Sequence, residues 1–416
     1  MSLAVRMCPI FHLAPAEEAS PRAKANLARG LLTGRLEPAA ATSDELKEVA
    51  DLCVNCHMCR LECPATVDIP KLMLEAKAAY VATNGLRVRD WILARLDVVG
   101  RWGCRFPRLA NALLTYRGSR FGLDPRTGVG ARPQARPLQP RQLSALPLSN
   151  ASPAPQGAAA ARRCCFSTPT PTTSTPSWPK PSWPCSSTTA SPSTYIPISR
   201  PPAWAWCRPA RSRCCAPIAE RNVRILAEAV RQGYHIVTPE PSAALCLTHE
   251  YLHILPDEEA RLVAENTSEA CTYLWRMHQT GTLQLDFRPQ RATIGYHQPC
   301  HLRALQVGSP GESLLRLIPG LQVIRLEHGC CGMAGSYGMK RENYRASLRI
   351  GWGLISALRQ PSIQAGASEC STCKMQMEQG TSKPTIHPLK LLALAYGKMP
   401  EFAALLTARG EELVVT

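Results

Sequence analysis

The 416-residue sequence contains no long hydrophobic run. No stretch of about 18 apolar residues, the minimum for a membrane-spanning helix, occurs without interruption. The first 20 residues also lack the apolar core and small-residue cleavage site of a secretory signal. In a large chain of this kind, the 19 cysteines are expected to hold metal or take part in redox chemistry rather than to form disulfides. We therefore expect a cytoplasmic protein.

Acidic residues are absent from one long segment. No Asp or Glu occurs between Pro125 and Ala219, and residues 126–215 hold 11 basic residues and 17 prolines. The whole chain has 48 basic and 31 acidic residues, a net charge of +17, so the rest of the chain carries 37 − 31 = +6. Nucleic-acid binding needs clustered basic residues on a folded surface. Because the excess belongs to one abnormal segment, we expect no nucleic-acid partner.

This acid-free segment has two interpretations. Its Pro, Ser and Thr content is typical of a linker without a core. Alternatively, it is coding sequence in the wrong frame, because codons permitted for Cys164–Pro181 regroup by one base to read LLLDTYANYFDPELAEA. That product has the pattern of a strand, an acidic loop and a helix. We favour a frameshift beginning between about 125 and 163, and we expect residues 125–215 to form no packed subdomain.

Composition divides the chain into four parts. The Cys-rich residues 1–85 are followed by a basic helical connector at 86–124, the acid-free segment at 125–215 and a C-terminal region at 216–416. The connector is amphipathic, and it either packs on the first part, which we favour, or lies on an anionic membrane surface. In the C-terminal region, hydrophobic periodicity predicts helices at 219–232, 344–358 and 387–396, alternating with strands at 234–237, 293–297 and 321–326. This alternation predicts a parallel α/β sheet.

The strongest local motif is the run Cys53-x2-Cys56-x2-Cys59-x3-Cys63-Pro64. This spacing is typical of bacterial ferredoxin-type [4Fe-4S] sites, in which the fourth cysteine ligates the other cluster of a two-cluster protein. A zinc site is the alternative, since zinc also takes C-x2-C pairs. Three cysteines at this period followed by Cys-Pro favour the iron-sulfur site.

Cys8-Pro9 matches the fourth ligand of a second such run. In two-cluster proteins the fourth cysteine of each run ligates the cluster of the other run, so Cys8 would complete the cluster of Cys53, Cys56 and Cys59. Cys63 would then point to a cluster whose other ligands would lie before Met1, so we expect an incomplete first domain. The alternative for Cys8 is an ordinary small buried residue.

A second group of cysteines lies in the C-terminal region, where one cysteine and then a pair follow predicted strands and two more lie at a probable helix start. Loops at the carboxyl ends of parallel strands converge, so these thiols are expected to meet at one site. A structural role as buried thiols is the alternative. The members of this cysteine group are Cys300, Cys330, Cys331, Cys370 and Cys373.

The lone histidines His235, His249 and His253 are expected to have surface or core roles rather than to bind metal.

These motifs, in this order, together with the HPLKLLALA segment near the end, resemble the iron-sulfur subunit of anaerobic glycerol-3-phosphate dehydrogenase and of glycolate oxidase, including forms fused behind an FAD-linked oxidase domain. The resemblance implies an α+β protein: an α-helical ferredoxin-like domain with [4Fe-4S] clusters, then an α/β cysteine-rich (CCG) domain. It also implies transfer of electrons from flavin to quinone. The cysteines of heterodisulfide reductase relatives bind a non-cubane [4Fe-4S] cluster, which assigns such a cluster to the five C-terminal cysteines here.

The sequence departs from the family pattern in two places. The first cluster run is truncated, and the first CCG repeat falls in the acid-free segment, so we expect the first half of the α/β domain to be disrupted. No flavin-binding fingerprint occurs, so FAD is expected on a partner domain or subunit. We expect an electron-transfer module of an FAD-linked dehydrogenase acting on glycerol 3-phosphate, glycolate, D-lactate or another 2-hydroxy acid, with quinone or a membrane anchor as a further partner. A heterodisulfide reductase-like enzyme is the alternative.

Overall fold

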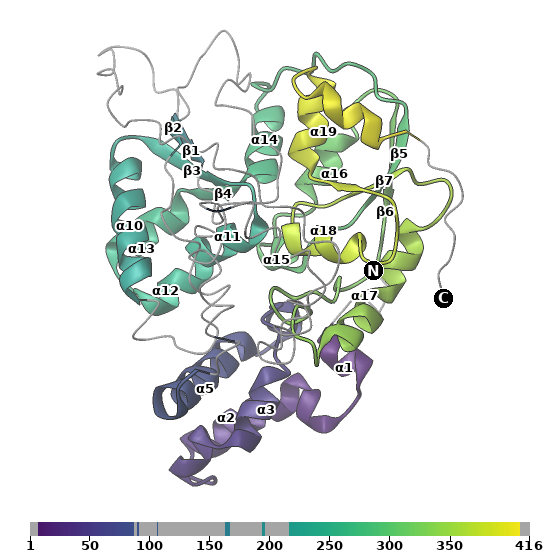
Figure 1. Ribbon diagram of the computed structural model, residues 1–416. Helices are drawn as coiled ribbons and strands as arrows, with labels where there is room; N and C mark the ends of the chain where they lie inside the picture. Colours follow the sequence, from purple (N-terminus) through teal and green to yellow (C-terminus); the bar gives the residue numbers. More distant parts are fainter. Residues whose placement is uncertain are drawn as a thin grey trace.

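The computed structural model describes residues 7–86 and 216–407, the backbone strands 163–166 and 194–195, and the single residues Asp90 and Phe106. Three units follow one another along the described chain: a helical domain and two regions built on parallel sheets (Figure 1). Within these residues, no helix combines the length and apolar character needed to cross a membrane. The predicted connector, including Cys104, lies outside the description except for residue 86, Phe106 and Asp90, whose carboxylate lies 2.8 Å from the Lys340 ammonium.

The N-terminal domain is helical, and side-chain caps fix where its longer helices begin. Ser20, Ser43 and Asp68 each accept a hydrogen bond from the backbone N–H three residues later, which satisfies a donor that a helix start leaves unpaired. Gly85, with φ of 76°, ends the last helix. The helices are α1 (Pro9–Leu13), α2 (Pro21–Leu32), α3 (Asp44–Asp51), α4 (Met58–Glu62) and α5 (Ile69–Asn84).

The first sheet has four parallel strands in the order β2-β1-β3-β4. Strand β3 (Tyr234–Thr238) follows helix α10 (Ala216–Arg231), and Gly233, with φ of 86°, lies between them. Strand β4 (Thr267–Glu269) precedes α14 (Ala270–Gln279), and the segment between β3 and β4 forms α11 (Pro241–Leu245), a π-helical turn (Cys246–Glu250), α12 (Tyr251–Ile254) and α13 (Glu258–Glu265).

Strands β1 (Arg163–Phe166) and β2 (Thr194–Tyr195) are the parts of residues 125–215 that the structure describes, and the expectation that this segment forms no packed subdomain stays a prediction. β1 pairs in parallel with β3, with Cys165 opposite Ile236. The physical reason is that an open edge of β3 offers backbone partners to any short extended segment. In the alternative reading frame, the predicted strand LLLD begins at about the position of β1. The printed sequence and the regrouped sequence therefore both have a strand here. The other residues of 125–215 lie outside the description.

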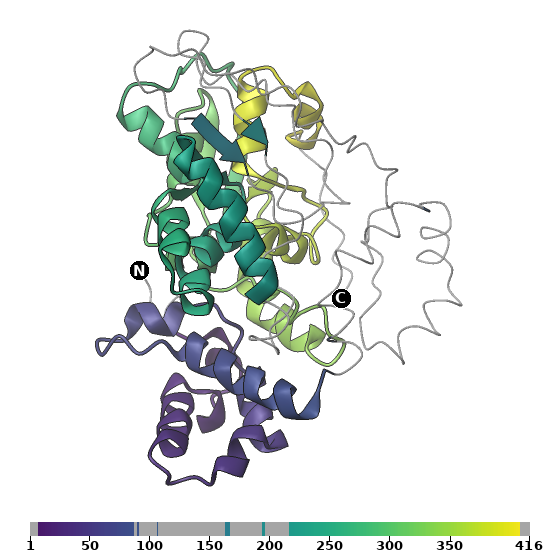
Figure 2. The same ribbon diagram turned by 90° about the vertical axis from the view of Figure 1, so that its left-hand side faces the viewer.

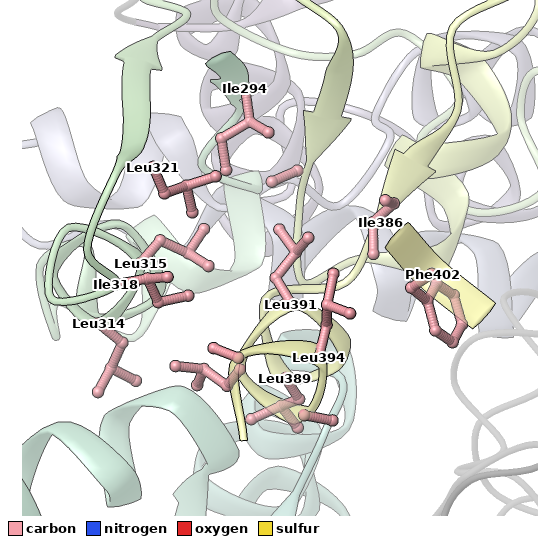
Figure 3. Close-up of a cluster of buried hydrophobic side chains, with 14 of the residues drawn as sticks. Ile294, Leu314, Leu315, Ile318, Leu321, Ile386, Leu389, Leu391, Leu394 and Phe402 are labelled. Carbon is pink, nitrogen blue, oxygen red and sulfur yellow. The ribbon is translucent and has the colours of Figure 1, made fainter. Parts of the chain in front are cut away.

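The second sheet, also fully parallel, has the order β6-β5-β7-β8. Helices cover it on both faces (Figures 1 and 2). Figure 3 shows its core, in which Ile294 of β5 and Leu321 of β6 meet the apolar side of α19, with Leu391 and Leu394. The strands are β5 (Ala292–Tyr296), β6 (Leu321–Arg325), β7 (Ala365–Ala367) and β8 (Thr385–Ile386), and the helices are α15 (Cys300–Ala304), α16 (Pro310–Leu315), α17 (Tyr344–Leu358), α18 (Ser371–Met377), α19 (Pro388–Ala395) and a final 3-10 helix (Pro400–Leu405).

The predicted fold class is confirmed: an α-helical domain precedes a region of parallel sheet and helices. The predicted helices and strands at 219–232, 234–237, 293–297, 321–326, 344–358 and 387–396 each coincide with an observed element to within three residues at either end.

Candidate iron-sulfur centres

The cysteine loop of the N-terminal domain lies between α3 and α4. Asn55 and His57 have φ of 56° and 59°, a left-handed conformation that non-glycine residues adopt rarely. Two such residues two positions apart turn the backbone sharply, so the thiols of Cys53, Cys56 and Cys59 come from one compact loop. The Lys77 ammonium, in α5, holds this loop by donating to the Cys53 carbonyl at 2.9 Å.

Four thiols gather at this loop. Cys8, the residue before α1, and Cys56 are both buried in one hydrophobic cluster with Val54 and Met58. Burial, followed by the charges of Cys56, Cys53 and Cys8, raises the pKa of the Cys59 thiol. Interactions of this kind require proximity. The structure therefore brings together Cys8, Cys53, Cys56 and Cys59, as many thiolates as one [4Fe-4S] cluster takes.

Cys63 stands apart from this group. It ends α4 and is half-buried, and it is not among the groups that most affect the pKa of Cys56 or Cys59. That its thiol serves a second cluster stays a prediction. A second ligand set to which it would belong is absent from the described residues.

The five C-terminal cysteines follow three strand ends of the second sheet. Cys300 opens α15 after β5, the pair Cys330 and Cys331 follows β6, and Cys370 precedes α18 after β7, with Cys373 inside that helix. All three strands run parallel, so their carboxyl ends lie at the same edge of the sheet.

The five thiols form one connected network. Cys331 interacts with Cys330 and Cys373 by side-chain hydrogen bonds, and Cys373 interacts likewise with Cys370. The hydrogen bond from Cys330 lowers the pKa of Cys331 well below its ordinary range, and the hydrogen bond from Cys373 lowers the pKa of Cys370 to about 7. Burial, followed by the charges of Cys331 and Cys370, raises the pKa of Cys300 to about 12.

Backbone packing closes this site. The Gly332 N–H donates to the Cys330 sulfur at 3.3 Å. Gly332 has φ of 90°, and a Cβ there would lie 2.0 Å from the Ser347 carbonyl oxygen of α17. Only glycine permits this approach.

The donor set fits an iron-sulfur group. Five neighbouring thiols, three of them buried, cannot all ionise, because neighbouring thiolates raise one another's pKa. Iron removes that conflict by binding thiolates directly. Nearby, both ring nitrogens of the fully buried His297 have no hydrogen-bond partner among the described residues, and burial lowers its pKa to about 4. A neutral ring beside the thiols adds no charge to the site.

Three further groups near the thiols were missed from the sequence. Arg303 lies one helical turn after Cys300, and the charges of Cys300, Cys330 and Cys373 act on it. Glu240 accepts a hydrogen bond from the Ser371 N–H at 3.0 Å, and burial together with the Cys370 charge raises its pKa. Glu369 is fully buried, and burial raises its pKa. Arg303 and Glu369 are each close in sequence to a singled-out cysteine, a signal that could have found them.

The two thiol groups lie next to each other. Cys300 packs against the cluster that contains Cys8 and Cys56, and its charge is the largest influence on Cys56 after burial. The domains are joined there by further contacts: His301 Nε2 lies 3.0 Å from the Asn55 carbonyl oxygen, and Arg60 donates to the Ala304 carbonyl at 3.3 Å. Two centres far apart in sequence thus face each other within one molecule.

Two family models match the chain, a 4Fe-4S dicluster domain at residues 3–68 and a cysteine-rich (CCG) domain at residues 294–378. The first range contains five of the cysteines discussed above, Cys8, Cys53, Cys56, Cys59 and Cys63. The second contains all five C-terminal ones.

Three curated proteins are similar over parts of the chain. A subunit of the anaerobic glycerol-3-phosphate dehydrogenase of Escherichia coli is 34% identical over 175 residues, which are 42% of this chain and 44% of that protein. Lactate utilization protein A 1 of Bacillus mycoides is 27% identical over 122 residues, 27% of this chain and 48% of that protein. An uncharacterized iron-sulfur protein of Methanocaldococcus jannaschii is 27% identical over 100 residues, 24% and 20% of the two chains.

The matches thus span less than half the length of each of these relatives. The 4Fe-4S dicluster domain implies [4Fe-4S] clusters, in agreement with the cysteines that gather at the first loop. The chain thus contains a match to a 4Fe-4S dicluster domain and a match to a CCG domain, and it is distantly similar to a subunit of anaerobic glycerol-3-phosphate dehydrogenase and to lactate utilization protein A 1.

Proposed function

We propose that this chain relays electrons from an FAD-bearing dehydrogenase, on a partner subunit or domain, to quinone or another acceptor. The observation that carries the proposal is the apposition of Cys56 and Cys300, where the two groups of cysteines lie side by side. Iron-sulfur clusters, when bound, accept and release single electrons.

The ligands in this proposal fall into two sets. Cys8, Cys53, Cys56 and Cys59 hold a [4Fe-4S] cluster, and Cys63 is left for a second one. The five CCG cysteines hold the other centre, a non-cubane [4Fe-4S] cluster. The buried His297 ring lies beside that centre without adding charge, and the Arg303 cation balances part of the charge of its thiolates. The substrate of the partner is glycerol 3-phosphate or lactate, by analogy with the names of the similar proteins, or glycolate or another 2-hydroxy acid, by the family resemblance of the cysteine motifs.

A single-turnover experiment tests the relay. The chain, reconstituted anaerobically with iron and sulfide, is reduced by photoreduced FMN and then mixed with menadione. We expect rapid reoxidation in the wild type and in Cys246→Ser, because Cys246 is a buried thiol of the π-helical turn outside both groups. In Cys56→Ser, the rate of reoxidation by menadione is expected to fall to that of protein without iron. An unchanged rate in Cys56→Ser would contradict the relay.

A second function, reduction of a disulfide at the CCG centre, is favoured by one observation. A cleft of about 650 Å³ opens between α4 and α16, bordered by Met58 and Leu61 on one side and by Arg303 and Gln298 on the other. Since Arg303 also faces the CCG thiols, a small molecule in the cleft would lie near them. Turnover of an added disulfide by the reduced chain, lost in Cys370→Ser, would favour this function over the relay.

A further inference from the structure

A third group of metal-binding side chains lies outside both cysteine sites. The segment His249-Glu250-Tyr251-Leu252-His253 runs from the π-helical turn into α12. Residues four apart on a helix lie on the same face. This H-E-x-x-H order is found in zinc sites, where the two histidines bind the ion.

A carboxylate from the ferredoxin-like domain completes a set of three. Asp68 Oδ2 lies 3.1 Å from His249 Nε2 and 3.7 Å from His253 Nε2, and the two Nε2 atoms lie 3.4 Å apart. Ligands bound tetrahedrally to zinc at about 2.0–2.1 Å are separated from one another by roughly 3.4 Å. The three atoms therefore already have the spacing of a zinc site. Their side chains remain 18–23% exposed, which leaves an open side.

Neighbouring charges are compatible with a cation here. Arg60 Nη1 lies 3.1 Å from Nδ1 and 2.9 Å from Nε2 of His249. A metal ion bound to Nε2 would lie in the plane of the His249 ring, along the lone pair of that nitrogen. Because Arg60 Nη1 is almost equally far from both ring nitrogens, it lies off this direction. The guanidinium therefore does not occupy the position of a metal ion bound to Nε2. With Arg60 positive and Asp68 and Glu250 negative, the fixed charge is −1. His57 adds a ring nitrogen within 4.8 Å of the Asp68 and His249 ligand atoms.

We propose that His249, His253 and Asp68 bind a divalent ion of the zinc type between the ferredoxin-like domain and α12. Asp68 is suited to both tasks, because its Oδ1 caps α5 by accepting from the Lys71 N–H while Oδ2 meets the histidines. The ion ties the start of α5, which follows the cysteine loop, to the C-terminal region. It thereby holds the loop against Cys300.

The position of Glu250 makes this site structural rather than hydrolytic. In H-E-x-x-H enzymes the glutamate acts as general base. Here Glu250 is 4% exposed, lies 2.8 Å from His57 Nε2 and accepts a longer bond from Asn55 at 3.4 Å. A carboxylate engaged in this way is not free to activate a metal-bound water.

The test uses the full chain after anaerobic reconstitution, so that iron occupies the thiols. Each protein is incubated with Zn²⁺ and dialysed, and its zinc content and zinc X-ray absorption are measured. We expect about one zinc per chain with a nitrogen and oxygen shell near 2.0–2.1 Å, distinct from sulfur near 2.3 Å. His253→Gln and Asp68→Asn are expected to lose this zinc. His278→Gln, in α14, is the matched control and is expected to keep it.

Two results would overturn the proposal: equal zinc in all four proteins, or a shell of sulfur alone in the wild type. Asp68→Asn keeps a residue able to cap α5, and unchanged iron content in that variant shows that the domain is folded. A failure of the cluster assignment is distinguishable, because zinc would then appear with sulfur ligands in all four proteins. The nitrogen and oxygen shell would still separate the wild type from His253→Gln.

Discussion

At the scale of single residues, two glycines allow the Cys330 loop to pack on α17. A Cβ on Gly351 would lie 2.1 Å from the Cys331 carbonyl oxygen, and one on Gly332 would lie 2.0 Å from the Ser347 carbonyl oxygen. The contacts are reciprocal, since each glycine meets the backbone of the other segment. The thiols of the CCG site therefore depend on backbone packing that no larger residue permits.

The first prediction compares two glycines of similar conformation. Gly332 and Gly233 have φ of 90° and 86°, but a Cβ at Gly233 would meet nothing within 4 Å. Gly233→Ala is expected to lower the free energy of unfolding by about 1 kcal/mol, from backbone strain alone. Gly332→Ala is expected to cost roughly 1–3 kcal/mol more, from the clash with Ser347. Equal denaturation midpoints for the two variants would show that the close approach has no energetic role.

The second prediction concerns His387, the residue before α19. Its Nδ1 accepts from the Leu389 N–H at 3.1 Å, and its Nε2 donates to the Pro239 carbonyl at 2.9 Å, so the neutral ring links α19 to the segment after β3. Burial lowers its pKa to about 4 from an ordinary 6.5. Below pH 6.5 the unfolded chain binds a proton that the folded chain does not, so stability falls between pH 6.5 and 4, by about 3 kcal/mol.

This loss is measured as the fall in the thermal midpoint with pH. His387→Asn keeps a cap acceptor without a titrating ring. We expect its midpoint to fall less between pH 6.5 and 4 than that of the wild type. Parallel curves would show that His387 does not titrate in this range.

At the scale of elements, α5 supports the cysteine loop. Lys77 is 6% exposed, and its ammonium donates to the Cys53 carbonyl at 2.9 Å and lies 3.7 Å from Asp51. Long basic side chains are rarely buried without such partners. The helix thus fixes the backbone at the first ligand of the loop.

The third prediction tests this support. Lys77→Met removes the donor to Cys53 and is expected to lower the free energy of unfolding by about 1–3 kcal/mol, the cost of an unsatisfied buried group. Faster iron release to a chelator is expected as well. Lys71→Met, an exposed position of the same helix, is the control and should release iron at the wild-type rate. Identical rates of iron release from both variants would show that Lys77 does not support the cysteine loop.

Elements of strong periodicity were predictable from the sequence, and irregular ones were not. The helix at Tyr344–Leu358 was predicted with about these bounds, because its apolar positions follow a helical period. Strands β1 and β2 were not, because the surrounding prolines and missing acidic residues suggested no sheet. Cysteine spacing indicated the first thiol group, and the position of cysteines after predicted strands and at a helix start indicated the second. The apposition of Cys56 and Cys300 depends on packing between residues 244 positions apart, which periodicity cannot show.

At the scale of the whole molecule, the helical domain and the second sheet place their cysteines at one boundary. Figures 1 and 2 both show the N-terminal helices against the lower end of the C-terminal region. The polar contacts there join the loop to α15, and Cys300 belongs to the CCG group while packing against Cys56. The central claim is that both thiol groups hold iron in the same chain.

Iron and acid-labile sulfide analysis, with EPR of the reduced protein, tests that claim most directly in four reconstituted proteins: the wild type, Cys56→Ser, Cys370→Ser and the control Cys246→Ser. We predict that Cys56→Ser and Cys370→Ser each lose about four irons per chain, the content of one [4Fe-4S] cluster. Each is also expected to lose a different EPR signal, while Cys246→Ser matches the wild type. Unchanged iron content and an unchanged spectrum in Cys56→Ser would contradict the account.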